Sequence, residues 1–246
     1  MIKEIFKIIA ILILGAIGGL LFQAFALPYL FTNPYFERFQ FVKILKEREI
    51  VVNPKEEITI TENVALENAI EKIKDSVVFI RSKSKTGKIL EGSGLILTSD
   101  GLILTLSDLV PQNYEVKIFL EGKDAEHPKE FTPKVLQRKN DLALLKIEEK
   151  NLKTISFADF EKTKLGERVF LLGVVSENNL EKKIVNEGII KSFDEKIIQT
   201  NISENKILQG SSLFNIEGQL VGLNEIDKEG KILAISIKEI RQFIGF

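Results

Sequence analysis

Side chains able to carry out acid–base or nucleophilic chemistry are few in this sequence of 246 residues. It contains no Cys, which excludes disulfides, thiol nucleophiles and cysteine-ligated zinc or iron–sulfur sites. Its single His, His127, excludes a site with several His ligands, and any Ser–His mechanism depends on that one residue. Glycine motifs that bind phosphate or dinucleotides do not occur in it. We therefore expect no cofactor and no metal.

The balance of charge excludes a further class of function. Lys and Arg total 34 and Asp and Glu total 35, which gives a net charge of −1 with His neutral. Because nucleic-acid binding needs an excess of basic residues, we exclude it as the main function. Hydrophobic residues make up 44% of the chain and charged residues 28%, as in an ordinary globular protein with a core. Folded elements must therefore position the functional side chains.

The first element is an uncharged, apolar segment at residues 8–27. As a helix it would span roughly 30 Å, the hydrocarbon thickness of a bilayer, which predicts a transmembrane anchor. Lys3 and Lys7 precede it, so the positive-inside rule places residues 1–7 in the cytoplasm and the rest of the chain outside. Two alternatives stay open: a signal peptide cleaved after the small-x-small sequence at 24–26, and a buried soluble helix.

Residues 28–62 are predicted to be an aromatic juxtamembrane segment followed by a polar linker. Its Tyr and Phe side chains fit an interfacial belt, and a self-association surface is the alternative. Within the preceding apolar segment, Gly15 and Gly19 form a G-x-x-x-G pair of the kind that lets membrane helices approach closely. After the linker, apolar residues at helical spacing predict a short amphipathic helix over 64–73, with Asn63 as its N-cap.

The pattern after Asp75 is that of an all-β protein, because short β-rich runs alternate with turn signals. Asp100-Gly101 lies between two such runs and predicts a two-residue hairpin. The run from 148 to 165 is a connection, and a short helix at 237–244 closes the chain. The predicted strands are Val77–Arg81, Gly94–Thr98, Leu102–Leu106, Val116–Leu120, Thr132–Leu136, Leu142–Ile147, Arg168–Gly173, Ile184–Phe193, Ile197–Thr200, Ser211–Phe214, Leu220–Asn224 and Ile232–Ser236. We therefore expect two six-stranded β-barrels, at about 76–150 and 160–236.

Six segments, taken in order, resemble parts of the HtrA/Deg-type trypsin-like serine proteases. Residues 92–105 resemble that family's first active-site hairpin, and 140–147 resemble the segment with its catalytic Asp. The other four are 165–169, 186–190, 199–200 and 215–224, which resemble strands of the second barrel. The resemblance covers about residues 64–244 and implies a trypsin-like double β-barrel, here without the family's usual PDZ domain.

The resemblance also implies where a catalytic triad would lie, and the chemistry at those positions differs. Asp108 stands in place of the family's His, Asp141 matches its Asp, and Gln209 stands in place of its Ser. A carboxylate does not reproduce an imidazole aligned between Ser and Asp, and an amide is not a nucleophile. Ile207 stands at the Gly whose backbone helps to form the oxyanion hole. Base, nucleophile and oxyanion loop are therefore all expected to be lost.

Alternative arrangements also stay open at this point. A shifted register makes Ser212, or its neighbour Ser211, the nucleophile, although no His accompanies either. His127 is expected to be an exposed loop residue. If the fold holds, Asp108 and Asp141 could lie close together and bind a cation or share a proton.

We expect a membrane-anchored pseudoprotease of the bacterial cytoplasmic membrane, with its folded part outside the cytoplasm. Its expected partners are the membrane, unfolded or extended peptides, and other copies of itself, as a trimer, or active relatives. The alternatives are a divergent active serine endopeptidase and a structural module of the cell envelope.

Overall fold

The computed structural model describes residues 2–26, 29, 62–121, 128–177 and 180–245. The chain divides into two compact units, Met1–Ile60 and Thr61–Phe246, and each is described by itself. Most of the predicted aromatic segment and linker at 28–62 lies outside the described residues.

The N-terminal unit contains one long apolar helix. α1 spans Ile2–Leu21, and a π-helical turn, η1, continues it over Phe22–Ala26. The stretch Ile9–Ala26 has a mean hydropathy of 2.3 and is long and apolar enough to cross a membrane. A signal sequence has the same properties, so the helix fits either an anchor or a signal.

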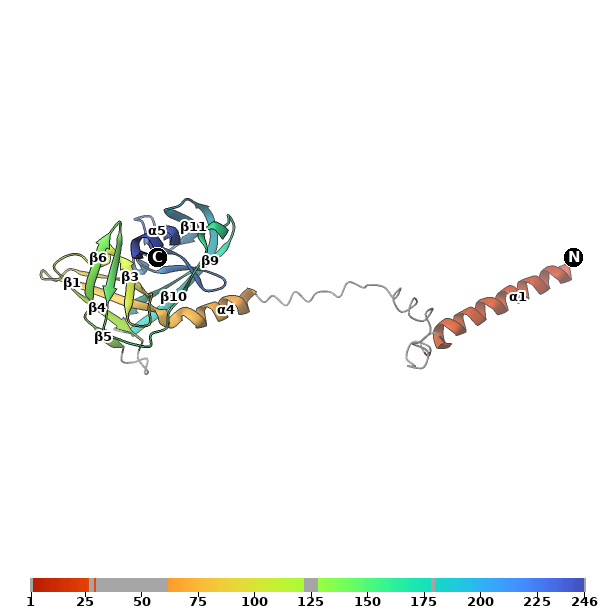
Figure 1. Cartoon of the computed structure of the whole chain (residues 1–246). Helices are drawn as coiled ribbons and strands as arrows, with labels where there is room; N and C mark the ends of the chain where they lie inside the picture. The colour runs from red at the N-terminus through yellow and green to blue at the C-terminus, as the bar shows by residue number, and fades with distance from the viewer. Residues whose placement is uncertain (1, 27–28, 30–61, 122–127, 178–179, 246) are drawn as a thin grey trace. The chain divides into compact units, whose positions relative to one another are not determined.

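The second unit begins with the amphipathic helix α4, Glu62–Ile73 (Figure 1). It buries Ala69 and Ile73, which repeat at helical spacing. The helix itself is therefore as predicted, but Asn63 is not its N-cap. The helix begins at Glu62, two residues before the predicted start at 64, so Asn63 lies inside the first turn.

The first sheet is a seven-stranded half-barrel with the strand order β5-β4-β1-β2-β3-β7-β6. All of its pairings are antiparallel, and β2 lies at its centre between β1 and β3. Its strands are β1 Val77–Ser84, β2 Ile89–Ile96, β3 Leu102–Leu106, β4 Tyr114–Leu120, β5 Lys129–Phe131, β6 Lys134–Lys139 and β7 Leu142–Lys146.

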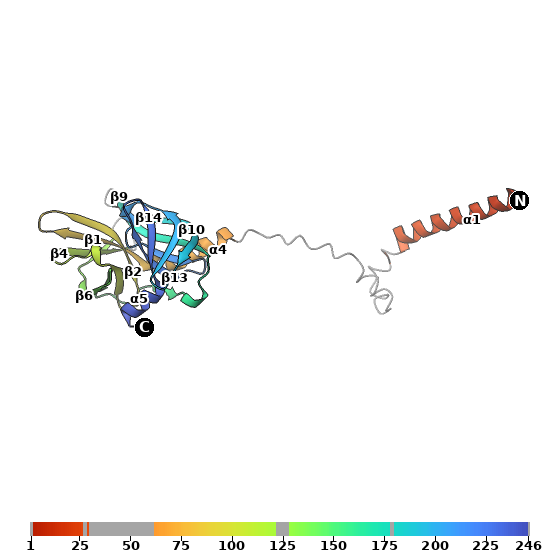
Figure 2. The ribbon, with the colours of Figure 1, turned by 90° about the horizontal axis from the view of Figure 1, so that it is seen from above.

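The second sheet closes into a six-stranded barrel, because β12 pairs with both β9 and β13 (Figure 2). A two-residue strand from the connection, β8, adds to β13 in parallel. Its strands are β8 Ser156–Phe157, β9 Arg168–Glu177, β10 Leu180–Phe193, β11 Ile197–Ser203, β12 Ser212–Asn215, β13 Gln219–Ile226 and β14 Lys231–Ser236.

The predicted fold class, a trypsin-like double barrel after an apolar helix and a short amphipathic helix, is confirmed. Three local predictions were wrong. The first sheet is a seven-stranded half-barrel and not the six-stranded barrel expected at 76–150. The predicted strand Thr132–Leu136 begins two residues before β6, and β5 was not predicted. The turn at Asp100-Gly101 is longer than two residues, since the Leu97 N–H donates to the Leu102 carbonyl and encloses Thr98–Gly101.

The two barrels share a hydrophobic core. One buried cluster joins β1 and β2 to residues of the second barrel such as Phe170, Leu172 and Phe214. The rings of Phe170 and Phe214 stack with centroids 5.7 Å apart. A smaller cluster, which includes Leu171 and Leu213, fills the second barrel alone. The two sheets therefore form one packed body.

The last helix, α5, spans Ile237–Ile244 and has well-defined ends. The Ser236 side chain caps it by accepting a hydrogen bond from the Glu239 N–H (3.2 Å), and Gly245 ends it with φ of +81°. α5 touches both β13 and β7, so it contacts both sheets.

Candidate functional site

Asp108 lies in a 3₁₀ turn, η4, that spans Ser107–Leu109 and directly follows β3. The turn is held from two sides. The buried Ser82 hydroxyl donates to the Leu109 carbonyl (2.5 Å), and the Ser107 N–H donates to the Asp141 carbonyl (2.7 Å). Leu109 is buried while Asp108 is exposed, so the fold anchors the turn and presents the carboxylate to solvent.

Asp141 lies in the turn of the β6–β7 hairpin. Lys139 pairs with Leu142, which leaves Asn140 and Asp141 as a two-residue turn. Both have positive φ, +51° and +64°. A two-residue hairpin turn of this type needs positive φ at both positions, and Asn and Asp tolerate it best among residues other than Gly. The residue types at 140 and 141 are therefore explained by the turn alone.

The two Asp residues line the same open groove, of about 480 Å³, together with Arg138. A third carboxylate, Glu225 near the end of β13, lines a neighbouring groove together with Asp108. Burial raises the pKa of Glu225, and the nearby charges of Asp141 and Asp108 raise it further. The structure therefore gathers three carboxylates where the resemblance implies a His and an Asp. Over the described residues, no group of three or more His, Cys, Asp or Glu side chains is arranged to hold a metal ion.

The sequence reasoning missed Glu225. The signal available was its position directly after Asn224, at the end of a segment already matched to the family. Its proximity to Asp108 and Asp141 depends on the packing of β13 beside the first sheet, which no local pattern reveals.

The loop from 205 to 211 is fixed in register by backbone hydrogen bonds. The Ser93 N–H donates to the Gln209 carbonyl (2.9 Å) and the Gly210 N–H to the Asn224 carbonyl (3.0 Å). Gly210 has φ of +75°, and a Cβ added there would lie 2.5 Å from the Ser93 carbonyl oxygen. The loop therefore joins β2 of the first sheet to β13 of the second, with Gln209 at the junction.

The side chain of Gln209 is buried and makes a hydrogen bond within the protein. It is 7% exposed, and its Oε1 accepts a hydrogen bond from the Ile226 N–H (2.8 Å). A buried amide that satisfies a backbone donor is a structural contact.

Backbone donors of this loop are also occupied. The loop forms a 3₁₀ turn, η6, over Lys206–Leu208, with Asn205 as its N-cap. The Ile207 N–H donates to Asn205 Oδ1 (3.3 Å), and the Gln209 N–H donates to the Lys206 carbonyl (3.1 Å). An oxyanion hole needs two free N–H groups aimed at the developing charge. The two N–H groups at the matching positions point to internal acceptors.

Both alternative serine nucleophiles are fully buried. Ser211 Oγ accepts a hydrogen bond from Asn224 Nδ2 (3.1 Å). Ser212 lies in β12 between β9 and β13, and its Oγ has no partner among the described residues. A substrate would reach either hydroxyl only if the barrel opened. His127 lies outside the described residues.

A family model described as a trypsin-like peptidase domain matches residues 92–223, more than half of the chain. The chain belongs to this family. Curated relatives add the HtrA/DegP type. A probable periplasmic serine endoprotease, DegP-like, from Pseudomonas putida is 37% identical over 91 residues, which are 35% of this chain and 19% of that protein. A protein of the same description from Chlamydia pneumoniae is 32% identical over 96 residues, 36% of this chain and 20% of that protein.

The match spans about a fifth of the length of these curated relatives. Solved structures support the fold of the trypsin-like domain. A serine endoprotease from Yersinia pestis aligns with a TM-score of 0.63 at 24% identity, covering 73% of this chain and 65% of that one. Deg5 aligns with a TM-score of 0.61 at 21% identity, covering 74% and 92%.

Proposed function

We propose that this chain is a proteolytically inactive member of the HtrA-like peptidases that acts by binding extended peptides or proteins, or by modulating active relatives. The observation that carries the proposal is the state of the 205–211 loop. Its central side chain is the buried amide of Gln209, and the N–H groups of residues 207 and 209 are bound to internal acceptors. Nucleophile and oxyanion donors are both needed for acyl transfer.

The residue at the position of the family's general base supports the same conclusion. Ser-type hydrolysis needs a group that takes the hydroxyl proton beside the nucleophile, and in this family an imidazole does so. Here the 3₁₀ turn after β3 carries the carboxylate of Asp108, with those of Asp141 and Glu225 nearby. A carboxylate in place of the imidazole gives no imidazolium for a neighbouring Asp to stabilise, so these groups do not reproduce the triad.

The groove beside the loop supports a binding role. An open groove of about 570 Å³ is lined by Gln209, Ile207 and Ile89, among other residues. Ile207 and Ile89 expose 41% and 51% of their surface there. An extended peptide that lays apolar side chains in such a groove can bind by strand addition without any bond being cut.

The proposed location is the outer side of a bacterial membrane, with the N-terminal helix as a retained anchor. Support comes from the apolar stretch Ile9–Ala26, from Lys3 and Lys7 before it, and from relatives described as periplasmic. The intact mass of the protein purified from the membrane fraction tests this. A mass lacking the first 26 residues would replace the anchor with a cleaved signal.

The test of inactivity uses the full chain in a nonionic detergent. We expect no cleavage of unfolded casein and no labelling by a fluorophosphonate, which reacts only with activated serines. An active DegP-like protease in the same detergent is the positive control, and a cooperative thermal transition shows that the sample is folded. Labelling that disappears in S212A or S211A would overturn the proposal in favour of a divergent peptidase.

The test of binding compares two matched variants. Fluorescence anisotropy of a labelled, unfolded casein peptide measures affinity for the full chain. I207E places a charge in the groove and is expected to weaken binding at least fivefold. I216E, at a similarly exposed isoleucine outside the groove, is the control and is expected to leave it unchanged. If the wild-type protein binds no peptide, a structural envelope module replaces the binding role.

A further inference from the structure

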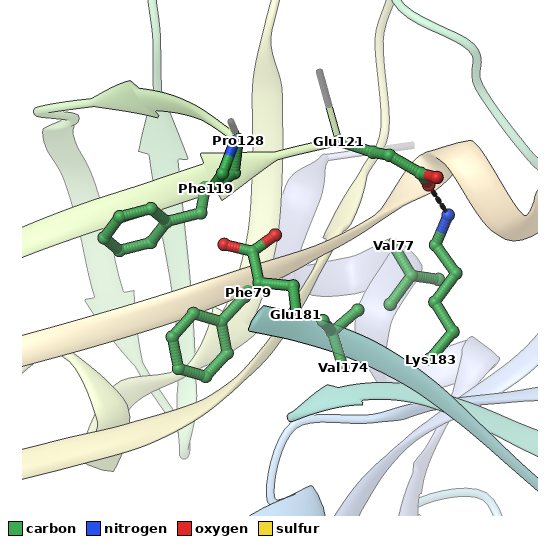
Figure 3. A pocket seen from close by; sticks show the side chains of 8 residues that line it. All are labelled: Val77, Phe79, Phe119, Glu121, Pro128, Val174, Glu181 and Lys183. Carbon is green, nitrogen blue, oxygen red and sulfur yellow. Dashed lines mark hydrogen bonds and ion pairs between the residues drawn. The ribbon is translucent and has the colours of Figure 1, made fainter. Parts of the chain in front are cut away.

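A second, smaller pocket lies between the two barrels and shares no residue with the groove beside Gln209. Its volume is about 160 Å³. Strands β1 and β4 supply one wall, and strands β9 and β10 supply the other (Figure 3). The residues that line it are Val77, Phe79, Phe119, Glu121, Pro128, Val174, Glu181 and Lys183.

Three cations among the described residues near this pocket are paired with carboxylates other than Glu181. Lys183 forms an ion pair with Glu121 at the pocket rim. Lys153 pairs with Asp75 at 2.6 Å. Arg81 is bound to Glu91 at 2.7 Å.

The guanidinium group of Arg81 makes further contacts. It donates to Ser176 Oγ (3.2 Å) and lies over the rings of Phe79 and Phe119, 5.3 and 5.7 Å from their centroids. It therefore has little freedom to turn toward the pocket.

Glu181 is the carboxylate left over. Figure 3 shows its carboxylate directed toward the side where Phe79 and Phe119 lie, away from the ion pair of Lys183 and Glu121. Among the described residues it has no hydrogen-bond or ion-pair partner. Burial raises its pKa to about 7, and the charge of Glu121 adds to the rise while Arg81 and Lys183 oppose it. A half-buried carboxylate without a partner is costly to keep ionised, so an external partner would be favoured.

We propose that this pocket binds an alkylammonium group, which pairs with the Glu181 carboxylate and lies against the phenyl walls. The ligand class follows from charge and size. Among the described residues, one carboxylate beyond the paired charges calls for a monovalent cation, and the apolar walls accept a hydrocarbon stem. A cavity of about 150 Å³ is known to hold benzene, so the pocket has room for about six non-hydrogen atoms. A butylammonium group, the end of a lysine side chain, fits this limit.

The first test is calorimetric titration of the full chain, in nonionic detergent at pH 8, with n-butylammonium chloride. We expect saturable binding, with 1-butanol and butyrate as neutral and anionic controls that do not bind. E181Q keeps the shape of the side chain and removes its charge, and is expected to weaken binding at least tenfold. E187Q, an exposed Glu on the same strand that pairs with Arg168, is the matched control and is expected to bind like the wild type.

The pH dependence gives an independent readout that a purely structural role would not produce. With a pKa of about 7, Glu181 is mostly ionised at pH 8 and mostly protonated at pH 5.5, so affinity is expected to fall about 30-fold between them. The charged groups that act on it are Arg81, Glu121 and Lys183. Butylammonium binding that is the same at both pH values, or the same in E181Q, would overturn the proposal, as would no binding at pH 8.

Two tripeptides distinguish the possible sources of the ammonium group. The first has a single lysine between two alanines and is capped at both ends, so its only amine is the lysine side chain. The second contains only alanine and has a free α-amino group. Tighter binding of the lysine peptide than of butylammonium supports a lysine side chain of a bound protein. Binding of butylammonium alone supports a small free amine.

Discussion

The Gln209 amide is a buried contact whose energetic value can be measured. Removing it in Q209A leaves the Ile226 N–H without its acceptor. We expect the free energy of unfolding to fall by about 1–3 kcal/mol, the usual cost of an unsatisfied buried group. Urea denaturation measures this. Q199A is the control, because Gln199 is exposed on β11 and should change stability by less than about 0.5 kcal/mol. Equal effects of the two would show that Gln209 is not a structural contact.

Glu181 predicts a pH-dependent stability with a definite sign. Its pKa in the folded protein, about 7, lies above the ordinary value of 4.5, so the folded state holds the proton more tightly than the unfolded state. The favourable contribution is complete below about pH 4.5 and is lost as pH rises through 7. The melting temperature of E181Q relative to wild type is therefore expected to increase from pH 4.5 to about 7 and then level off. A constant difference over this range contradicts the assignment.

At the same scale, the family resemblance implies which residues stand at the catalytic positions but not what their side chains contact. Asp108 and Gln209 follow from aligning family motifs. The bond from Ile226 to Gln209, and the occupied N–H groups of residues 207 and 209, depend on how the loop folds. Three-residue 3₁₀ turns have no periodic pattern, so this part of the site was not predictable.

At the scale of elements, the backbone of Gly210 lies so close to the Ser93 carbonyl of β2 that a side chain at position 210 would clash with it. G210A places a Cβ 2.5 Å from a backbone oxygen, in addition to the strain at φ of +75°. G87A is the matched control, with φ of +87° and nothing within 4 Å. We expect both to lose about 1 kcal/mol from the backbone and G210A to lose at least about 2 kcal/mol more. Chemical denaturation compares them, and equal losses would mean that the loop yields easily.

Two substitutions in the β6–β7 turn distinguish a role of Asp141 in turn geometry from a role of its carboxylate in the candidate site. D141G suits a φ of +64° and removes a carboxylate near Asp108 and Glu225, so we expect stability to be unchanged or to increase by up to about 1 kcal/mol. D141A cannot make local hydrogen bonds at positive φ and is expected to lose about 1 kcal/mol. Thermal unfolding of the pair is the measurement. A large loss in D141G would show that the carboxylate itself is needed.

Strands with a marked apolar pattern were predictable, and irregular or very short ones were not. β3 matches its prediction residue for residue, because five apolar or β-branched residues follow a glycine turn. β8 has only two residues and pairs in parallel with a strand far along the chain, so no local signal marks it. The predicted strand Thr132–Leu136 begins before β6, because Thr132 and Pro133 lie outside it, and the three-residue β5 before this pair was not predicted.

For the whole molecule, the shared core predicts one unfolding transition for both barrels. The cluster that contains Leu172 also contains residues of β1, β2 and β3, whereas that of the adjacent Leu171 is confined to the second barrel. We expect wild type and both L172A and L171A to unfold in a single calorimetric transition, each variant destabilised by about 2–5 kcal/mol. Two separate transitions in the wild type would show that the barrels are independent.

Each of the two helices that flank the barrels contacts the sheet that is farther from it in sequence. α4 precedes the first sheet, yet Ala69 and Ile73 lie against Gly218, in the turn between β12 and β13. α5 follows the second barrel, yet it touches β7, and Asn140 Nδ2 lies 3.4 Å from Glu239 Oε1. During synthesis, α4 emerges early, and its contact with the β12–β13 turn cannot form until the chain has grown past residue 218. A chain that stops before residue 218 therefore leaves this part of α4 uncovered. Chaperones and quality-control proteases can recognise such exposed apolar surface, which the complete chain buries.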